Sequence, residues 1–381
     1  MSGAGDTVLG LPLEFWFAGP LGVPFHIWSV VVTLAGLTIG SFLNVVIHRM
    51  PLNQSVVSPP SHCPKCDYRI PLRHNLPVLS WFWLRGRCAN CGAPISPRYV
   101  AVEALTGAVF LTTWLTFGRA EPLMAAALCV LFAGFIAATF IDFEHLIIPD
   151  EITLGGIVAG FLFSAATPAL QGAANAPAAM RASALGIFVG GGLVYGILRL
   201  GKLLFGRQKL ALEPGTRVIF HEGGVVLPDG EIPHEELFYR KSDAVVLHAQ
   251  RLELADRCYA DRPVRLELRR EPPVLRIGDE VFNAEEEPWL AAVTDRITLP
   301  REAMGFGDVK FMAAIGAFLG WPATVFALLA SSLIGTAVAL VLILLRRQNW
   351  SGRLGYGPYL AIAAMIWVFG GRTLVRAWLG L

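Results

Sequence analysis

The feature that most constrains the fold is a series of apolar segments, with the charged residues confined to the stretches between them. Hydrophobic residues make up 54% of the 381 positions and charged residues only 16%, and the mean hydropathy is +0.55. This composition is far from that of a soluble domain and is typical of a chain with several membrane spans. The pattern predicts eight spans, at about residues 26–47, 99–117, 122–141, 151–168, 182–204, 308–319, 323–345 and 356–370.

The positions of the basic residues predict the orientation of these spans. The segment 50–98 carries six of them: Lys65, Arg69, Arg73, Arg85, Arg87 and Arg98. Cytoplasmic loops are enriched in Lys and Arg, so we expect this segment in the cytoplasm and both termini outside. The first twenty residues contain Asp6 and Glu14 and no basic residue, which argues against a cleaved signal peptide. The net charge of +2 gives no reason to expect a nucleic-acid partner.

Residues 207–300 differ from the rest because charges become frequent and strand-like stretches appear. Residues 264–268 alternate apolar and charged side chains with period two, as a half-buried strand does. Turn signals such as Gly223-Gly224 and Pro272-Pro273 separate such stretches. We therefore expect a small, β-rich cytoplasmic insertion between the fifth and sixth spans.

Two carboxylates occur where apolar segments meet the cytoplasmic side. Asp142 ends the third span, which runs inward, and Asp308 begins the sixth, which runs outward. The two acids are therefore expected at the same membrane depth, where ionisable groups are costly and usually functional. If they meet, they share one proton, so that one can activate water while the other polarises a peptide carbonyl. Gly305 and Gly307 would let an extended substrate approach the backbone closely.

Other interpretations of these acids remain open at this stage. Asp308 can be the N-cap of the sixth span, since Asp is favoured there. Asp142 can be an ordinary interfacial acid, and helices that share a depth need not be neighbours. Glu144 and Asp150 compete as functional carboxylates, although Asp150 is more typical of the N-cap of the fourth span.

Two Cys-x-x-Cys pairs lie in the 50–98 loop, with about twenty residues between them. Four thiolates at this spacing are typical of a zinc ribbon, in which a tetrahedral Zn²⁺ has a structural role; the expected ligands are Cys63, Cys66, Cys88 and Cys91. Thiols stay reduced in the cytoplasm, which disfavours disulfides. His62 is adjacent and is an alternative ligand, whereas Cys129 and Cys258 are read as ordinary small side chains. A polar loop with few apolar residues needs such a metal to fold.

The expected fold class is therefore an all-α polytopic membrane protein of about eight transmembrane helices, with a cytoplasmic zinc-ribbon-like loop and a small β-rich cytoplasmic insertion. Its expected parts are the N-terminus with the first span, the cysteine loop, spans two to five, the insertion, and spans six to eight, at residues 1–49, 50–98, 99–206, 207–300 and 301–381.

Several motifs together resemble the bacterial type IV prepilin leader peptidases, which are aspartic proteases of the Gly-x-Gly-Asp type. The matching segments are 40–49, the two cysteine pairs with 74–81 between them, 92–99, Ile141-Asp142 with 148–150, 305–310 and 357–360. The resemblance implies a multi-pass enzyme of the bacterial inner membrane with its active site facing the cytoplasm. It implies Asp142 and Asp308 as the catalytic pair that removes the short basic leader of prepilins and of type II secretion pseudopilins.

The resemblance also implies a second activity. Many members methylate the new N-terminal amine with S-adenosylmethionine, and the cysteine loop accompanies that activity. We therefore expect methylation here, although no glycine-rich nucleotide motif is present to locate the methyl donor, and Glu103 is only a candidate residue.

The insertion departs from the family, whose typical members join spans five and six by a short loop. It can gate substrate, dock a partner or be a tolerated addition. Two alternatives to the bifunctional enzyme also stay open: a peptidase without methyltransferase activity, and a non-catalytic membrane scaffold of the pilus or secretion machinery. The sequence leaves open which pilins are cut, the oligomeric state, and whether the short sixth span crosses fully.

Overall fold

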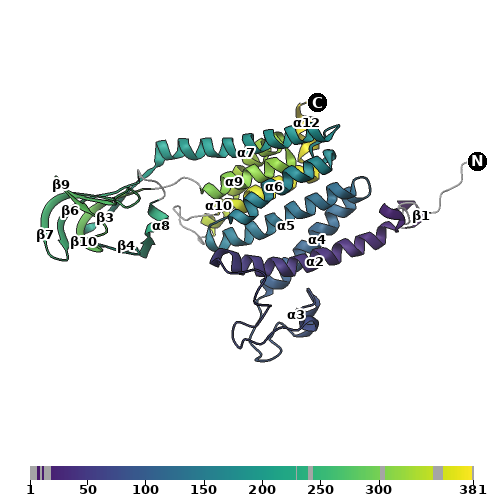
Figure 1. Cartoon of the computed structure of the whole chain (residues 1–381), viewed down its shortest axis with the longest axis horizontal. Helices are drawn as coiled ribbons and strands as arrows, with labels where there is room; N and C mark the ends of the chain where they lie inside the picture. Colours follow the sequence, from purple (N-terminus) through teal and green to yellow (C-terminus); the bar gives the residue numbers. More distant parts are fainter. Residues whose placement is uncertain are drawn as a thin grey trace, which may run out of the picture. The chain divides into compact units, whose positions relative to one another are not determined.

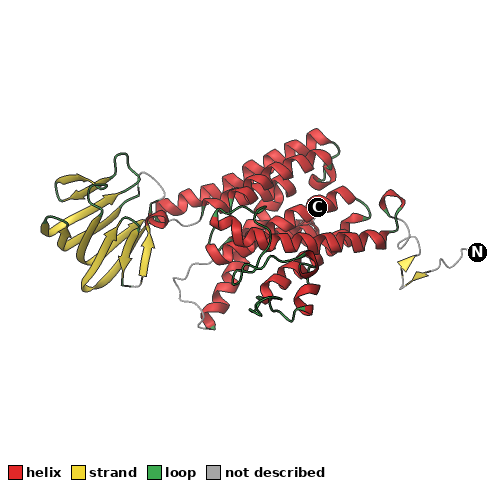
Figure 2. Ribbon diagram, turned by 60° about the horizontal axis from the view of Figure 1, so that its bottom comes forward, coloured by secondary structure: helices red, strands yellow, loops and turns green. Residues whose placement is uncertain are grey.

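The computed structural model of the chain describes residues 7–8, 11–12, 19–228, 230–238, 243–300, 305–345 and 355–379. Asp6 and Glu14, on which the expectation about a signal peptide rests, lie outside these ranges. The chain divides into a helical unit, Met1–Tyr195 with Phe306–Leu381, and a second unit, Gly196–Gly305, that contains the large sheet. Figure 2 shows the two kinds of structure in red and yellow.

Apolar helices dominate the helical unit (Figure 1). Its helices in chain order are α2 (Phe25–Arg49), α3 (Leu79–Trp83), α4 (Pro97–Thr113), α5 (Pro122–His145), α6 (Asp150–Ala166), α7 (Ala176–Phe205, which continues into the second unit), α9 (Phe306–Leu319), α10 (Trp321–Leu344), α11 (Gly357–Ile366) and α12 (Arg372–Leu379). A short two-stranded ribbon, β1 (Thr7–Val8) and β2 (Leu11–Pro12), precedes them. α2 packs against α4, α6 against α9, and α10 against α11.

Within the described residues, six helices are long and apolar enough to cross a membrane. They are Phe25–Leu52, Pro97–Gly118, Pro122–His145, Ala176–Leu203, Trp321–Leu344 and Gly357–Val375. The other two expected spans correspond to α6 and α9, which have 17 and 14 residues. At 1.5 Å per residue, α9 is only about 21 Å long, whereas the hydrocarbon core is about 30 Å thick. The structure thus supports a multi-span protein, and the count of eight stays a prediction.

α9 is enclosed by its neighbours, which explains how a short helix can end inside an apolar unit. Nearly every side chain from Asp308 to Phe318 is buried. The backbone carbonyl of Ala317 accepts hydrogen bonds from Ser164, Gln171 and Ser183, at 3.1, 2.8 and 2.8 Å. Terminal carbonyls have no partner within their own helix and are costly to leave unpaired in lipid. Polar side chains from the surrounding elements therefore stabilise the end of α9.

Glycines on α7 let it approach α9 at backbone distance. A Cβ at Gly186 would lie 2.1 Å from the carbonyl oxygen of Gly316, and one at Gly190 would lie 2.6 Å from that of Met312. Gly192 and Gly196, on the same helix, have no described atom within 4 Å of such a Cβ. Within the described residues, the close approach is therefore made at Gly186 and Gly190.

The second unit confirms the expected β-rich insertion. Its eight strands form one antiparallel sheet in the order β5-β4-β3-β10-β6-β7-β8-β9. They are β3 (Arg207–His221), β4 (Gly224–Leu227), β5 (Gly230–Pro233), β6 (Val245–Leu254), β7 (Cys258–Glu267), β8 (Val274–Ile277), β9 (Glu280–Asn283) and β10 (Trp289–Pro300). The short helix α8 (His234–Leu237) brings Leu237 and Phe238 into its core. The first and last long strands, β3 and β10, are direct neighbours with Arg207 opposite Pro300.

Candidate functional site

Asp142 lies in the last turn of α5, and only 4% of it is exposed. The backbone N–H of Gly357 donates a hydrogen bond of 2.9 Å to its Oδ2. Gly355 also lies close to this oxygen: an added Cβ would be 2.4 Å from it at Gly355 and 3.0 Å from it at Gly357. The backbone of Gly355 and Gly357 therefore packs directly against the Asp142 carboxyl.

Hydroxyl contacts hold this segment in place. The Tyr356 hydroxyl, between the two glycines, lies 2.7 Å from Oγ of Ser331 and 3.0 Å from Oγ of Ser332, both on α10. The Gly357 N–H points at a carboxylate because it is a free donor at the start of a helix, where the first N–H groups lack intrahelical acceptors. The start of α11 thus supplies a hydrogen-bond donor for one carboxylate oxygen of Asp142.

Asp308 lies in the first turn of α9 and is 8% exposed. Because α9 begins at Phe306, Asp308 is the third helical residue and not an N-cap, so the capping interpretation is wrong. The two glycines differ. A Cβ at Gly307 would lie 3.3 Å from Cβ of Ile148, which indicates close backbone packing, whereas Gly305 is exposed just before the helix.

Three contacts bring the chain around Asp308 to the chain around Asp142. Ile148 packs against Gly307 and also against Gly357, where a Cβ would lie 3.0 Å from its Cδ1. Lys310 forms an ion pair with Asp150. The rings of Phe135 and Phe311 meet edge to face with centroids 5.4 Å apart. The two acids therefore belong to segments that pack together at one end of α5 and α9.

The competing acids have other partners. Glu144 forms an ion pair with Arg98, at the start of α4. Asp150 was expected as an N-cap, which is wrong by one position: Pro149 is the N-cap and Asp150 is the first helical residue, paired with Lys310. Its negative charge still suits the positive end of the α6 dipole. Both acids are more exposed than Asp142 and Asp308.

The four expected cysteines come together. Their sulfur atoms all lie within 4.8 Å of one another, with Cys63 3.9 Å from Cys91 and Cys66 4.0 Å from Cys88. A tetrahedral ion with metal–sulfur bonds of about 2.3 Å requires sulfur atoms about 3.8 Å apart. The spacing therefore fits a four-thiolate metal site, and the cluster can hold a metal ion.

The two cysteine pairs have matching backbone turns. The N–H of Asp67 donates to the carbonyl of Cys63 (2.9 Å), and the N–H of Gly92 donates to that of Cys88 (3.0 Å). Backbone N–H groups of Cys91 and Asn90 lower the pKa of the Cys88 thiol to about 6, which favours the thiolate that metals bind. His62 is outside the cluster and its Nδ1 lies 3.1 Å from the carbonyl of Pro60, so the alternative ligand is not supported.

The remaining candidates lie apart from these two sites. Cys129 is buried within α5 and Cys258 is exposed on β7. Glu103, in the second turn of α4, accepts a 2.7 Å hydrogen bond from the backbone N–H of Val78. Its carboxylate therefore holds the cysteine loop against α4.

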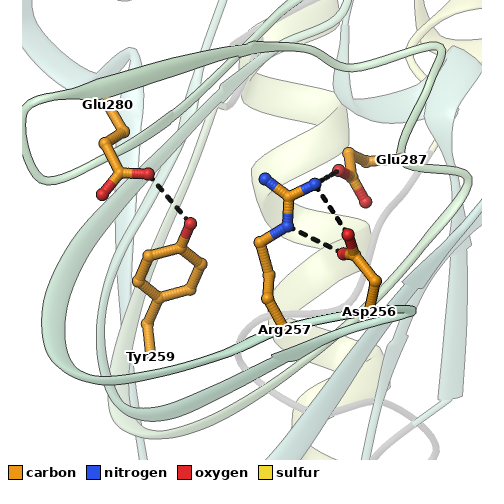
Figure 3. Close-up of polar contacts among 5 residues, drawn as sticks. All are labelled: Asp256, Arg257, Tyr259, Glu280 and Glu287. Atoms are coloured by element: carbon orange, nitrogen blue, oxygen red, sulfur yellow. Dashed lines mark hydrogen bonds and ion pairs between the residues drawn. The ribbon is translucent and has the colours of Figure 1, made fainter.

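A further polar cluster lies in the second unit, where Figure 3 shows five residues. Arg257 binds both oxygens of Asp256, at 2.7 and 3.0 Å, and approaches Glu287 at 3.5 Å. Tyr259 donates a 2.9 Å hydrogen bond to Glu280. The Arg257–Asp256 pair is exposed, where such pairs contribute little, whereas the Glu287 side chain is only 9% exposed. The ion pairs connect the β6–β7 turn with the loop before β10 and are adequately explained as surface contacts.

Sequence reasoning missed the residues that surround Asp142. Gly355 and Gly357 had no role assigned, although residues 357–360 contributed to the resemblance. Ile148 was read only as part of a motif. The available signal was a Gly-x-Gly directly before an apolar helix, the same pattern that precedes Asp308.

Comparison with known proteins gives two matching family models. Residues 34–117 match the Bacterial Peptidase A24 N-terminal domain, and residues 129–213 and 289–340 match the Type IV leader peptidase family. The two models together span more than half of the chain and omit most of the inserted sheet. No solved structure matches the chain significantly.

Curated proteins give the same result. The "Prepilin leader peptidase/N-methyltransferase" of Aeromonas hydrophila is 29% identical over 94% of this chain and 96% of its own length. The "Type 4 prepilin-like proteins leader peptide-processing enzyme" of Escherichia coli O78:H11 is 36% identical over 48% of this chain and 71% of its own length. A protein of Dichelobacter nodosus with the same name as the first is 33% identical over 50% and 70%.

Proposed function

Because this chain belongs to the type IV leader peptidase family, we propose that it cleaves the leader from prepilins or pseudopilins and methylates the new N-terminus. The relatives whose names combine these two activities support the proposal along most of the chain. The structural observation that carries it is the buried Asp142 carboxyl, held by Gly357 and packed beside the segment of Asp308. The same observation favours an enzyme over a non-catalytic scaffold, which needs no buried acids.

The mechanism that we infer is that of an aspartic protease. The ionised carboxyl of the Asp142–Asp308 pair takes a proton from water as the water oxygen attacks the peptide carbon. The protonated carboxyl donates to the carbonyl oxygen, so that a neutral tetrahedral intermediate forms. Gly357 keeps one oxygen of Asp142 occupied, which leaves the other to face water. Collapse of the intermediate returns a proton to the leaving amine and restores the pair.

Zinc is the metal that we propose for the four cysteines, with a structural role. Four thiolates leave no open coordination position, and a closed site does not activate water. The methyl donor implied by the family is S-adenosylmethionine. Glu103, the residue suggested from sequence, is engaged with Val78, so we assign the donor no residues.

For the topology, we infer eight crossings of the bacterial inner membrane, with α6 and α9 as shortened crossings inside the helical unit. Both acids then face the cytoplasm, as does the cysteine loop with its six basic residues. A site at this face suits a substrate with an apolar segment after its leader, because that segment can lie in the bilayer beside the acids.

The test is a single reaction in proteoliposomes that contain the purified chain, a prepilin and S-adenosylmethionine. Mass spectrometry of the product should show loss of the leader and addition of one methyl group at the new N-terminus. Loss of the leader without methyl transfer would show a peptidase that lacks methyltransferase activity. A related leader peptidase, run in a parallel reaction on the same prepilin, is the positive control. If that control cleaves and this chain leaves the prepilin intact, the non-catalytic scaffold is favoured.

A further inference from the structure

The loop that carries the four cysteines exposes most of its large apolar side chains. Leu72, Leu76, Leu79, Phe82 and Trp83 are 87%, 46%, 66%, 63% and 74% exposed. The loop was expected to be polar, with few apolar residues. Its apolar residues are instead concentrated between the two cysteine pairs and turned outward. Exposed apolar groups that cluster in this way mark a surface that binds something.

The outward orientation is fixed by the short helix α3. Leu79, Phe82 and Trp83 have the spacing i, i+3, i+4, which places them on one side of a helix. Ser80, on the other side, is buried. Trp81 is turned inward as well, and its Nε1 donates a 3.2 Å hydrogen bond to the carbonyl of Ile95 beside the second cysteine pair. The apolar side of α3 is therefore a built surface.

A hydrogen bond fixes the depth of this surface along a membrane-spanning helix. Val78, just before α3, donates through its N–H to Oε2 of Glu103 at 2.7 Å. Glu103 is six residues beyond Pro97, where the spanning segment Pro97–Gly118 begins. Six residues of helix rise about 9 Å. The headgroup region on each side of a bilayer is about 5–8 Å thick, so a contact about 9 Å along this segment places α3 close to the membrane interface.

The charges around the apolar side suit the same surroundings. Arg73, Arg85 and Arg87 are exposed and flank α3 on both sides in the chain. Basic residues beside Trp, Phe and Leu are typical of segments that lie in the membrane interface, where the rings reach the acyl boundary and the cations meet anionic headgroups.

We propose that α3 and its flanking leucines are an interfacial anchor, which docks the cysteine loop into the same bilayer that α2 and α4 span. The two ends of the loop join these helices, at Arg49 of α2 and at Pro97 of α4 (Figure 1). Phe82 and Trp83 enter the headgroup–acyl boundary, and the Cys63–Cys91 cluster is held at the membrane surface by Trp81. The inference is independent of the proposed enzymatic activity, because it rests on the spanning helices and the loop.

The test is photocrosslinking of the full-length protein in nanodiscs of phosphatidylethanolamine and phosphatidylglycerol. The photoreactive amino acid p-benzoylphenylalanine replaces Phe82 in one variant and Lys65 in a matched control. Lys65 is also exposed in the same loop, on the first cysteine turn. We expect lipid adducts at position 82 in several-fold excess over position 65, without any peptide substrate present. Equal labelling at the two positions, or adducts at position 82 only with an added peptide, would overturn the proposal.

A second measurement covers the case in which the photoreactive variant does not fold. Brominated lipids quench tryptophan at the membrane interface, so the difference in fluorescence between wild type and Trp83→Phe reports Trp83 alone. We expect strong quenching of this difference signal with the bromines placed near the headgroups. An unquenched Trp83 in nanodiscs, with bound metal retained in both proteins, would show that water surrounds α3.

Discussion

A carboxyl buried at the end of an apolar helix is costly unless a donor faces it. For Asp142 the donor is a backbone N–H, and the residues that supply and flank it are glycines. A side-chain donor would add bulk, whereas the absence of a side chain lets the glycine backbone lie directly against the carboxyl. The proposed chemistry therefore depends on the absence of side chains at residues 355 and 357 as much as on the two acids.

Replacement of either acid by its amide should stop cleavage. Asp142→Asn and Asp308→Asn keep the size of the side chain but remove the ionisable proton, and general acid–base catalysis contributes about 10²–10⁴-fold. We expect at least that loss in the rate of leader removal. Glu144→Gln, at the Arg98 ion pair, is the matched control and should retain activity. Wild-type cleavage by either Asn variant contradicts the catalytic pair.

A single methyl group at residue 355 should also impair cleavage. In Gly355→Ala the new Cβ would lie 2.4 Å from Oδ2 of Asp142, so the carboxyl or the segment has to move. Misplacement of a catalytic group by about 1 Å can cost about 10²-fold. Gly370→Ala is the control, since no described atom lies within 4 Å of its added Cβ. Equal rates of cleavage in the two variants, measured on the same prepilin, would show that residue 355 does not position Asp142.

Asp142 and Asp308 were predicted as a pair from sequence because hydropathy and charge predict the depth and direction of each helix, and the structure brings their two segments together. Gly355 was not, because its contact with Asp142 joins residues more than two hundred positions apart. Such contacts depend on how helices pack around one another, and apolar periodicity does not specify the neighbour. The N-cap assignments of Asp150 and Asp308 failed for a smaller reason: the helices begin one or two residues earlier than the apolar pattern does.

Among the elements, the cysteine loop is built from two similar turns that each supply two sulfurs. Cys63→Ser should reduce bound metal from one ion per chain to almost none, since a three-thiolate remnant holds zinc much more weakly. Cys258→Ser is the control, because this thiol is exposed in the inserted sheet and lies outside the cluster. Elemental analysis of the purified proteins measures the number of metal ions bound per chain. We expect cleavage to be less affected than metal content, and full retention of zinc by Cys63→Ser would contradict the assigned ligand.

The contact between α7 and α9 gives a prediction of stability. In Gly186→Ala the Cβ would lie 2.1 Å from the Gly316 carbonyl oxygen, so the helices must separate. Overpacking of this kind costs about 1–3 kcal/mol, and we expect a lower midpoint of thermal unfolding in detergent. Gly192→Ala, on the same helix but without a described neighbour within 4 Å, should leave the midpoint unchanged or raise it, because Ala favours a helix more than Gly does. Equal midpoints in the two variants would mean that this contact does not form.

Hydropathy predicted which segments are helices but not which helix is enclosed by the others. α6 and α9 are as apolar as the longer helices, yet they are short, and α9 is enclosed. What distinguishes α9 is the set of polar side chains on other elements that bond to its last carbonyls. Those partners lie on three consecutive elements between residues 164 and 183, more than 130 positions before Ala317, so no local pattern around α9 indicates them.

At the scale of the whole molecule, the inserted sheet is a self-contained addition to the family's helical protein. The family model stops at residue 213 and resumes at residue 289. The sheet has its own core, from Val218 on β3 to Leu299 on β10. Because β3 and β10 pair along their length, with Arg207 opposite Pro300, the insertion leaves and returns at nearly the same point.

Because the insertion begins and ends on neighbouring strands, we predict that the sheet can be removed. A variant in which a short Gly-Ser linker replaces residues 207–300 should fold in the membrane, because the linker needs to span only one pair of neighbouring strands. We expect the rate of cleavage to be within about tenfold of that of the full chain, which corresponds to about 1.4 kcal/mol in the activation barrier.

Removal of residues 222–288 alone is the contrasting variant. It leaves the β3–β10 pair with Val218, Phe220 and Leu290 uncovered, and an isolated two-stranded ribbon is unstable in water. That variant should aggregate. A folded 207–300 deletion that binds zinc but no longer cleaves would show that the sheet takes part in the reaction.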